Sequence, residues 1–161
     1  MQSAGPKRDT TVPRTEVVAV HLAMIALVLG VGIALGTSVR PGDWYSGLNK
    51  AWFTPPPAAF GPVWTVLYVL IGWVGARKAL YGGARGLWVG QMALNWLWTP
   101  VFFGLHMTAA GLGIILAMLA LILWFIFAEW RRDRMSALMF VPYAVWVTLA
   151  SAVNAAVVWL N

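Results

Sequence analysis

The sequence predicts an all-α integral membrane protein, a bundle of five transmembrane helices with a long lid loop between the first two helices. Hydrophobic residues make up 61% of the 161 residues and charged residues only 10%, a composition far from that of soluble globular domains. Five apolar stretches approach the roughly 20 residues that a helix needs to cross a bilayer. They cover residues 17–39, 62–80, 86–104, 108–129 and 136–160. Uninterrupted stretches of this length favour helices over the short alternating segments of a membrane barrel.

The N-terminal region divides into a polar tail and a retained first helix. Residues 1–15 are polar and contain two prolines, so we predict a disordered tail ahead of a membrane domain at residues 16–161. The first apolar stretch is longer than the hydrophobic region of a signal peptide, and no cleavage motif closes it. Two G-x-x-x-G motifs, at residues 32–36 and 86–90, indicate close helix packing, either within the bundle or between two copies.

Residues 40–61 form the one long connection. Pro55, Pro56 and Pro57 are expected to exclude regular helix there, and the five aromatic residues of this segment are too many for a solvated linker. We therefore predict a lid over the outer mouth of the bundle, with Arg40, Asp43 and Lys50 on its charged rim. A loop that rests on lipid headgroups is the alternative.

Aromatic and polar residues recur every three or four positions on three of the predicted helices, which puts them on one face of each helix. These faces are predicted to line a common interior, although Asn and Gln side chains also serve simply to join membrane helices. The fourth helix lacks such a face and is expected to meet lipid or a second copy. The predicted lining residues are Trp64 and Tyr68 of the second helix, Gln91, Asn95 and Trp98 of the third, and Tyr143, Trp146 and Ala150 of the fifth, whose face also carries Asn154.

Charge predicts the orientation. Nine of the eleven basic residues fall on one side of the five spans, and only Arg40 and Lys50 fall on the other. The positive-inside rule then places the N-terminus in the cytoplasm and the C-terminus outside a bacterial cytoplasmic membrane, with the outer membrane as the open alternative. Topology therefore accounts for the net charge of +6, and no nucleic-acid partner is predicted. The absence of cysteine excludes disulfides and thiolate metal ligands.

Three motifs, in order along the chain, resemble the TspO/MBR family of tryptophan-rich sensory and translocator proteins. They are PGDWYSGLNKAWFTPPPAAFGPVWTVLY, NWLWTPVFFG and VPYAVWVTLASAVN, and the resemblance runs from Pro41 to Asn154. It implies five transmembrane helices, homodimers, and a pocket under the first loop that binds porphyrins such as protoporphyrin IX. By the same resemblance, Tyr45 is the aromatic residue of the lid, Trp64 and Trp146 are paired indoles against the tetrapyrrole, and Asn95 is a polar contact.

The resemblance leaves three functions open. The first is a porphyrin-binding sensor or translocator in tetrapyrrole regulation or transport, with Arg40 and Lys50 as candidates to pair with the propionates. The second is light- and oxygen-dependent degradation of the bound porphyrin. No conventional catalytic constellation is present, so this reaction would have to run through Trp64 and Trp146. The third is an ion-coupled transporter, which calls for an ionisable residue near the membrane midplane. Glu129 and Arg77 instead lie at predicted helix ends, where their charged groups are expected to reach water.

The expected ligand chemistry needs no obligatory cofactor and no metal site. His21 and His106 lie at predicted membrane boundaries, so haem is expected to bind by stacking, without an axial histidine. Cholesterol-type ligands are doubtful, because the segment after Asn154 lacks the tyrosine and the basic residue of the animal recognition motif. A formal match to such a motif runs from Val39 to Lys50, but patterns of this kind are weakly specific.

Overall fold

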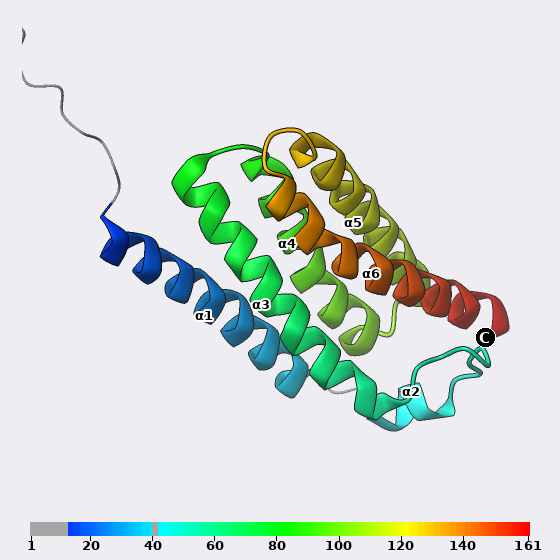
Figure 1. Ribbon diagram of the computed structural model, residues 1–161. Coiled ribbons are helices and arrows are strands. Elements are labelled where there is room, and N and C mark those ends of the chain that lie inside the picture. Colours follow the sequence, from blue (N-terminus) through cyan, green and yellow to red (C-terminus); the bar gives the residue numbers. More distant parts are fainter. Residues whose placement is uncertain (1–12, 40–41) are drawn as a thin grey trace, which may run out of the picture.

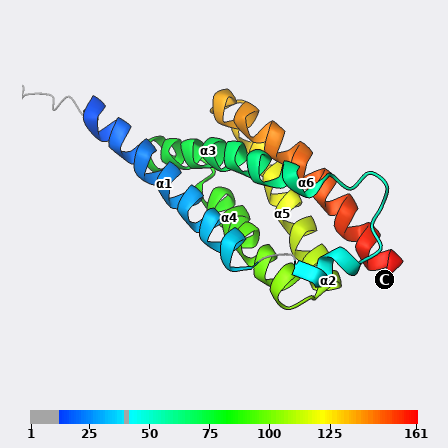
Figure 2. The same cartoon turned by 90° about the horizontal axis from the view of Figure 1, so that it is seen from below.

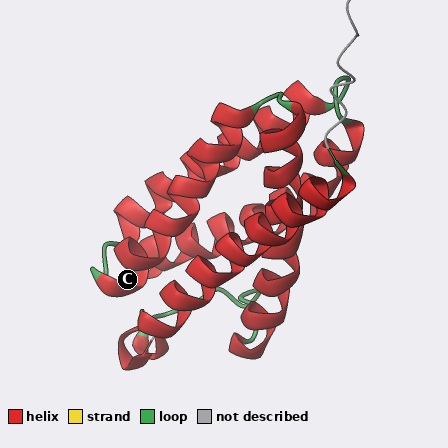
Figure 3. Ribbon diagram, turned by 90° about the vertical axis from the view of Figure 1, so that its left-hand side faces the viewer, coloured by secondary structure: helices red, strands yellow, loops and turns green. Residues whose placement is uncertain are grey.

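The computed structural model describes residues 13–39 and 42–161, and within these ranges the fold is entirely helical, with no strand (Figure 3). Four helices, α1, α3, α5 and α6, are long and apolar enough to cross a membrane. The elements in order are α1 (Arg14–Ser38), α2 (Gly42–Gly47), α3 (Pro57–Tyr81), α4 (Arg85–Thr99), the π-helical turn η1 (Pro100–Gly104), α5 (Thr108–Glu129) and α6 (Arg134–Leu160).

The start of the second long helix corrects one expectation. The three consecutive prolines were expected to exclude helix, but α3 begins at Pro57, directly after the extended Pro56. Proline is well tolerated in a first helical turn, because the N–H groups there have no partner inside the helix. The predicted loop also contains the short helix α2, and residues 14–15 of the predicted tail are helical. The rest of that tail, residues 1–12, and Arg40 lie outside the described residues.

The helices form a bundle in which α3 packs against α1 on one side and α6 on another, while α5 contacts both α4 and α6 (Figures 1 and 2). Glycine lets α1 approach closely, because a Cβ on Gly72 of α3 would lie 2.7 Å from the Cα of Ile25. Each G-x-x-x-G motif contributes one glycine inside the bundle: Gly32 faces Tyr68 and Gly90 faces Leu121.

Helix α5, which was expected to meet lipid or a second copy, also contributes to the bundle core. Its buried residues recur every three or four positions and include Ile115, Met118, Ile122 and Phe125, so one face is part of the bundle core. The opposite face carries exposed apolar residues, among them Phe127. This outer face is therefore the part of α5 that remains for lipid or a partner.

A cluster of charges joins the C-terminal end of α3 to the end of α5 and the turn that follows it. Lys78 Nζ lies 2.6 Å from a carboxylate oxygen of Glu129, and Glu129 is only 1% exposed. Glu129 was expected to reach water, but the structure buries it in this ion pair. Arg77 donates to both carboxylate oxygens of Asp133 at 3.0 Å. Burial acts to raise the pKa of Asp133, but hydrogen bonds from Arg77, Ser136 and Lys78 outweigh it and hold this pKa well below its usual range.

Candidate functional site

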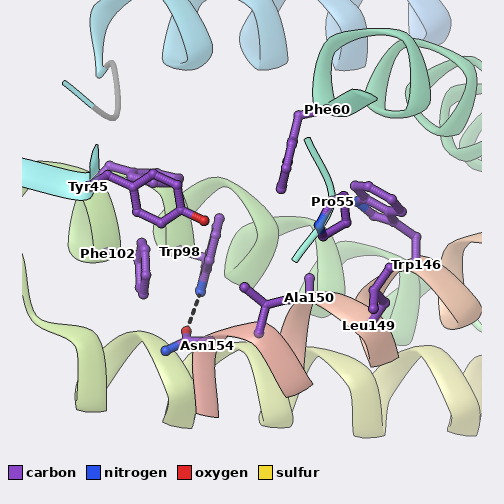
Figure 4. Close-up of a pocket in the computed structure, with 11 residues that line it drawn as sticks. Tyr45, Pro55, Phe60, Trp98, Phe102, Trp146, Leu149, Ala150 and Asn154 are labelled. Carbon is purple, nitrogen blue, oxygen red and sulfur yellow. Dashed lines mark hydrogen bonds between the residues drawn. The ribbon is translucent and has the colours of Figure 1, made fainter. Parts of the chain in front are cut away.

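A pocket lies at the end of the bundle where α2 and the loop after it meet α4, η1 and α6 (Figure 4). Its volume is about 370 Å³, including the part that opens to the outside. Its exposed lining is almost wholly apolar. The lining residues are Tyr45, Pro55, Phe60, Trp98, Phe102, Phe103, Trp146, Leu149, Ala150, Val153 and Asn154.

One wall of the pocket is produced by the π-helical turn that ends α4. Pro100 has no N–H, which interrupts the α-helical hydrogen-bond pattern toward the preceding turn. In the turn that follows, the Pro100 carbonyl accepts from the N–H of Leu105, five residues on, at 2.9 Å. This wider turn carries two pocket-lining rings, Phe102 and Phe103, whose centroids lie 4.9 Å apart and edge-on. Trp98 stacks on Phe102, with centroids 5.0 Å apart and planes 15° apart. The result is a continuous aromatic wall.

The floor of the pocket holds Trp98 in place. Asn154 of α6 is 1% exposed and accepts a hydrogen bond from Trp98 Nε1 at 3.2 Å, the contact drawn in Figure 4. Its amide nitrogen donates to the carbonyl of Thr108 at 2.9 Å. Gly111 leaves room for this arrangement, since a Cβ there would lie 2.9 Å from the Phe102 ring. Asn154 therefore fixes the orientation of the indole by joining α4, α5 and α6.

The outer wall comes from α2. The ring of Tyr45 packs edge-on against Phe103 at 5.3 Å between centroids, and partial burial raises the pKa of Tyr45. Lys50 Nζ lies 4.8 Å from the centre of the Tyr45 ring, a cation–π distance. The neighbouring Trp44 stacks on His106 at 4.1 Å. Aromatic contacts thus hold α2 against the turn between η1 and α5.

The remaining wall contains Trp146 of α6, whose ring meets Phe60 of α3 edge-on at 5.5 Å. The indole Nε1 of Trp146 is buried and has no hydrogen-bond partner among the described residues. A buried donor of this kind is costly unless a ligand or water supplies an acceptor. Ala150 lies one turn further along α6 on the same lining.

A second group of predicted residues lies outside the lining and forms a hydrogen-bond network among the helices. Tyr68 donates to the side-chain oxygen of Asn95 at 3.1 Å, and the Asn95 amide donates to the Tyr143 hydroxyl at 2.9 Å. The Tyr143 hydroxyl lies 3.3 Å from Met118 Sδ. Trp64 packs over Tyr68, with centroids 5.1 Å apart. These groups satisfy one another, so in this structure they join helices and do not line the cavity.

The structure therefore brings together only part of the predicted set. Tyr45, Trp98, Trp146 and Ala150 line the cavity, and Lys50 lies against its outer wall. Gln91 is fully buried and donates to the carbonyl of Trp88, away from the cavity. Asn154, predicted on the same inward face as Trp146 and Ala150, also lines the cavity. The lining residues that sequence reasoning missed are Pro55, Phe60, Phe102, Phe103, Leu149 and Val153. Helical spacing offered a signal for two of them, since Leu149 lies three residues from Trp146 and Val153 three residues from Ala150.

Within residues 13–39 and 42–161, no cluster of three His, Asp or Glu side chains is arranged to hold a metal ion. The two histidines lie in separate places. His21 of α1 bonds through Nδ1 to the carbonyl of Val17 at 2.8 Å and packs on Trp73, while His106 stacks on Trp44.

Comparison with known proteins agrees with the three sequence motifs. The TspO/MBR family matches residues 22–160. A tryptophan-rich sensory protein of Cereibacter sphaeroides is 34% identical over 146 residues, covering 89% of this chain and 92% of that protein. Protein CrtK of Rhodobacter capsulatus is 39% identical over 140 residues, covering 80% of this chain and 84% of that protein. The translocator protein of Homo sapiens is 32% identical over 139 residues, covering 80% of this chain and 82% of that protein. This chain therefore belongs to the TspO/MBR family.

Proposed function

We propose that this membrane protein binds a porphyrin, protoporphyrin IX or haem, in the aromatic pocket beneath α2, and that binding serves tetrapyrrole regulation or transport. The observation that carries the proposal is the pocket itself, an apolar cavity walled by Trp98, Phe102 and Trp146. A porphyrin is a flat apolar ring system, and its binding favours aromatic rings that stack or meet it edge-on. The names of the relatives, a sensory protein and a translocator protein, are consistent with recognition of a small molecule at a membrane.

The carboxylates of a porphyrin need a cation near the pocket mouth, and Lys50 is the described residue that can supply it. Its ammonium group donates to the carbonyls of Ser46 and Leu48 at 3.1 and 3.0 Å while it lies over Tyr45. If a propionate reached this group, Lys50 would donate to a charged carboxylate in place of the two neutral carbonyls, and a charged acceptor makes a stronger hydrogen bond. Tyr45 would then separate the charged rim from the apolar cavity.

Porphyrin binding requires the pocket to open. The free space inside the cavity accommodates only about one water molecule, and the aromatic walls are closely packed. The part most readily displaced is the outer wall, which consists of α2 and residues 48–56. We call this segment the lid, and we propose that it moves outward to admit the ligand.

We further propose that α4 and η1 together form a fifth transmembrane segment. They cover residues 85–104 without a break, which is about the length that a span requires. Five spans place the termini on opposite sides, and the positive-inside rule puts the N-terminus in the cytoplasm of a bacterial cell. The exposed apolar face of α5 is the proposed contact for a homodimer.

A titration in the dark tests porphyrin binding. Protoporphyrin IX is added to the detergent-purified protein, and tryptophan quenching, corrected for porphyrin absorbance, is followed in parent, Trp146→Phe and Trp64→Phe. Saturable binding at micromolar or tighter affinity is expected. Trp146→Phe should weaken binding more than Trp64→Phe, because only Trp146 lines the cavity. Linear quenching that is the same in all three proteins would reject the pocket as a porphyrin site.

The position of Trp146 on the pocket wall also favours a second candidate function, light- and oxygen-dependent degradation of the bound porphyrin. Illumination of the same samples separates the two functions. If the tryptophans react, loss of the porphyrin Soret band per bound molecule should collapse in Trp146→Phe. Equal loss per bound porphyrin in all three proteins would exclude reactive tryptophans and leave binding alone.

A further inference from the structure

The loop that follows α2 is tied to the C-terminal end of α6. Figures 1 and 2 both show this loop beside the end of the chain. The side chain of Asn161 pairs with both backbone groups of Asn49: its oxygen accepts from the Asn49 N–H at 2.9 Å, and its nitrogen donates to the Asn49 carbonyl at 3.1 Å. The Asn49 side chain adds a longer bond of 3.3 Å to the carbonyl of Leu160. Two segments 112 residues apart are thereby joined.

These bonds are the main polar attachment of the lid. Among the described residues, the other hydrogen bonds of residues 48–56 stay within the lid or reach only the start of α3: Leu48 to Tyr45, Lys50 to Ser46 and Leu48, Thr54 to Ala51, and Ala59 to Pro56. The lid is otherwise held by packing of side chains such as Tyr45 and Pro55 on the pocket. Breaking the contact at Asn161 therefore leaves only the longer bond from the Asn49 side chain to the Leu160 carbonyl between residues 48–56 and α6 of the described chain.

We propose that Asn161 is a latch that controls access to the aromatic pocket by holding the lid through the backbone of Asn49. The role in ligand access rests on the proposed porphyrin function, whereas the effect on opening of the pocket does not. An amide that donates and accepts at once fits both backbone groups of one residue. The bonds are solvent-exposed, so each contributes little and the latch opens thermally.

The position of the latch suits such a role. Two strongly exposed tryptophans lie close to it along the chain: Trp52 of the lid, three residues after Asn49 and 95% exposed, and Trp159 of α6, two residues before Asn161 and 89% exposed. Exposed indoles are typical of the boundary between membrane and water. The latch is then at the level where a porphyrin, with an apolar ring and charged carboxylates, would approach. Its release would let residues 48–56 of the lid swing away from α6 while α2 keeps its contact with His106.

Cysteine labelling tests the latch without any ligand, because the chain contains no natural cysteine. The reporter is a Val153→Cys variant, since Val153 lines the pocket and is 7% exposed. Its reaction with a water-soluble maleimide measures how often the pocket opens. Asn161→Ala removes two bonds to the lid and should speed labelling roughly fivefold to tenfold. Asn49→Ala removes only the longer bond to Leu160 and should have a smaller effect.

Two matched controls separate lid opening from other causes. Ser46→Ala removes an exposed hydrogen bond inside α2, to the carbonyl of Gly42, and should leave labelling unchanged. A second reporter, Val157→Cys, lies outside the pocket lining in the last turns of α6 and is fully buried in the parent. Its labelling should not change in Asn161→Ala. Equal acceleration at both reporters would mean that the end of α6 frays, and it would overturn the latch.

The remaining outcomes are equally decisive. Parental labelling of the Val153→Cys reporter in Asn161→Ala, or the same acceleration in Ser46→Ala, would also overturn the proposal. Stopped-flow mixing with protoporphyrin IX is the second readout, and Asn161→Ala should raise the association rate by a similar factor. Failure of the parent to bind porphyrin, together with faster labelling in Asn161→Ala, would reject the proposed function and leave the latch standing. Porphyrin binding by the parent, with labelling and association rates unchanged in Asn161→Ala, would support the proposed function and reject the latch.

Discussion

The buried ion pair between α3 and α5 predicts an unusually large loss of stability when Lys78 is replaced by Met. Lys78 Nζ contacts Glu129 at 2.6 Å and Asp133 at 3.1 Å, and its side chain is 4% exposed. Lys78→Met keeps much of the side-chain volume but leaves the Glu129 carboxylate buried, with the N–H of Ala84 as its remaining hydrogen-bond partner. Removing one member of a buried pair typically costs about 3–5 kcal/mol. We expect a loss of stability in this range.

The two members of the pair should not be equivalent. In Glu129→Gln, the new amide oxygen can still accept from Ala84, and Lys78 keeps its contact with Asp133. The expected loss is therefore smaller, about 1–2 kcal/mol. The double variant Lys78→Met, Glu129→Gln no longer contains a stranded carboxylate and should be more stable than Lys78→Met alone.

Reversible unfolding in mixed detergent and SDS micelles, followed by circular dichroism, measures these differences. Arg131→Met is the matched control, because Arg131 is an exposed basic residue in the adjacent turn and should change stability by less than about 0.5 kcal/mol. The reasoning would be refuted if Lys78→Met were as mild as Arg131→Met. It would also be refuted if the double variant were less stable than Lys78→Met.

Three further predictions follow from the packing. Asn95→Leu deprives two tyrosine hydroxyls of their shared partner and should cost about 1–2 kcal/mol in the same unfolding assay. Gly72→Ala should cost about 1–3 kcal/mol, because the new methyl group would meet the α1 backbone at Ile25, whereas Gly36→Ala, which has open space around it, should be neutral or slightly stabilising. The pKa of Asp133 is lowered by folding, so its contribution to stability is complete above pH ~4 and is lost as the pH falls below that value; stability measured between pH 5 and pH 3 should therefore fall less steeply in Asp133→Asn than in the parent.

Long apolar stretches and the sequence motifs predicted most of the helical architecture, because hydrocarbon leaves a chain few alternatives to helix. The structure adds what local pattern does not encode. From the sequence, Pro57 is expected to break a helix. In the structure the preceding residue, Pro56, is extended, so Pro57 is a normal first helical residue. The wider turn at Pro100 follows from a missing N–H, but its consequence, two phenylalanine rings on the cavity wall, depends on how α5 lies beneath it.

The candidate site was predicted in part for a related reason. Periodicity identified the faces of three helices that point inward, and Trp98, Trp146 and Ala150 do line the cavity. Periodicity does not give depth along the bundle. Asn95 and Tyr143 share the inward face but lie where the helices meet, so they bond to each other. Gln91, one turn before Asn95 in α4 and farther from the cavity, is buried at 0% exposure for the same reason.

The two ends of the bundle are held by different forces, and this difference bears on where a ligand can enter. At one end, Lys78, Glu129 and Asp133 join three helices through short, largely buried charged contacts. At the other end, the lid is held by exposed amide bonds at Asn161 and by aromatic packing around Tyr45. Local opening follows the weaker set of interactions, because exposed hydrogen bonds cost far less to break than a buried ion pair. We therefore expect the charged end to be the fixed base of the bundle, and the proposed ligand to enter at the end where α2, residues 48–56 and α6 meet.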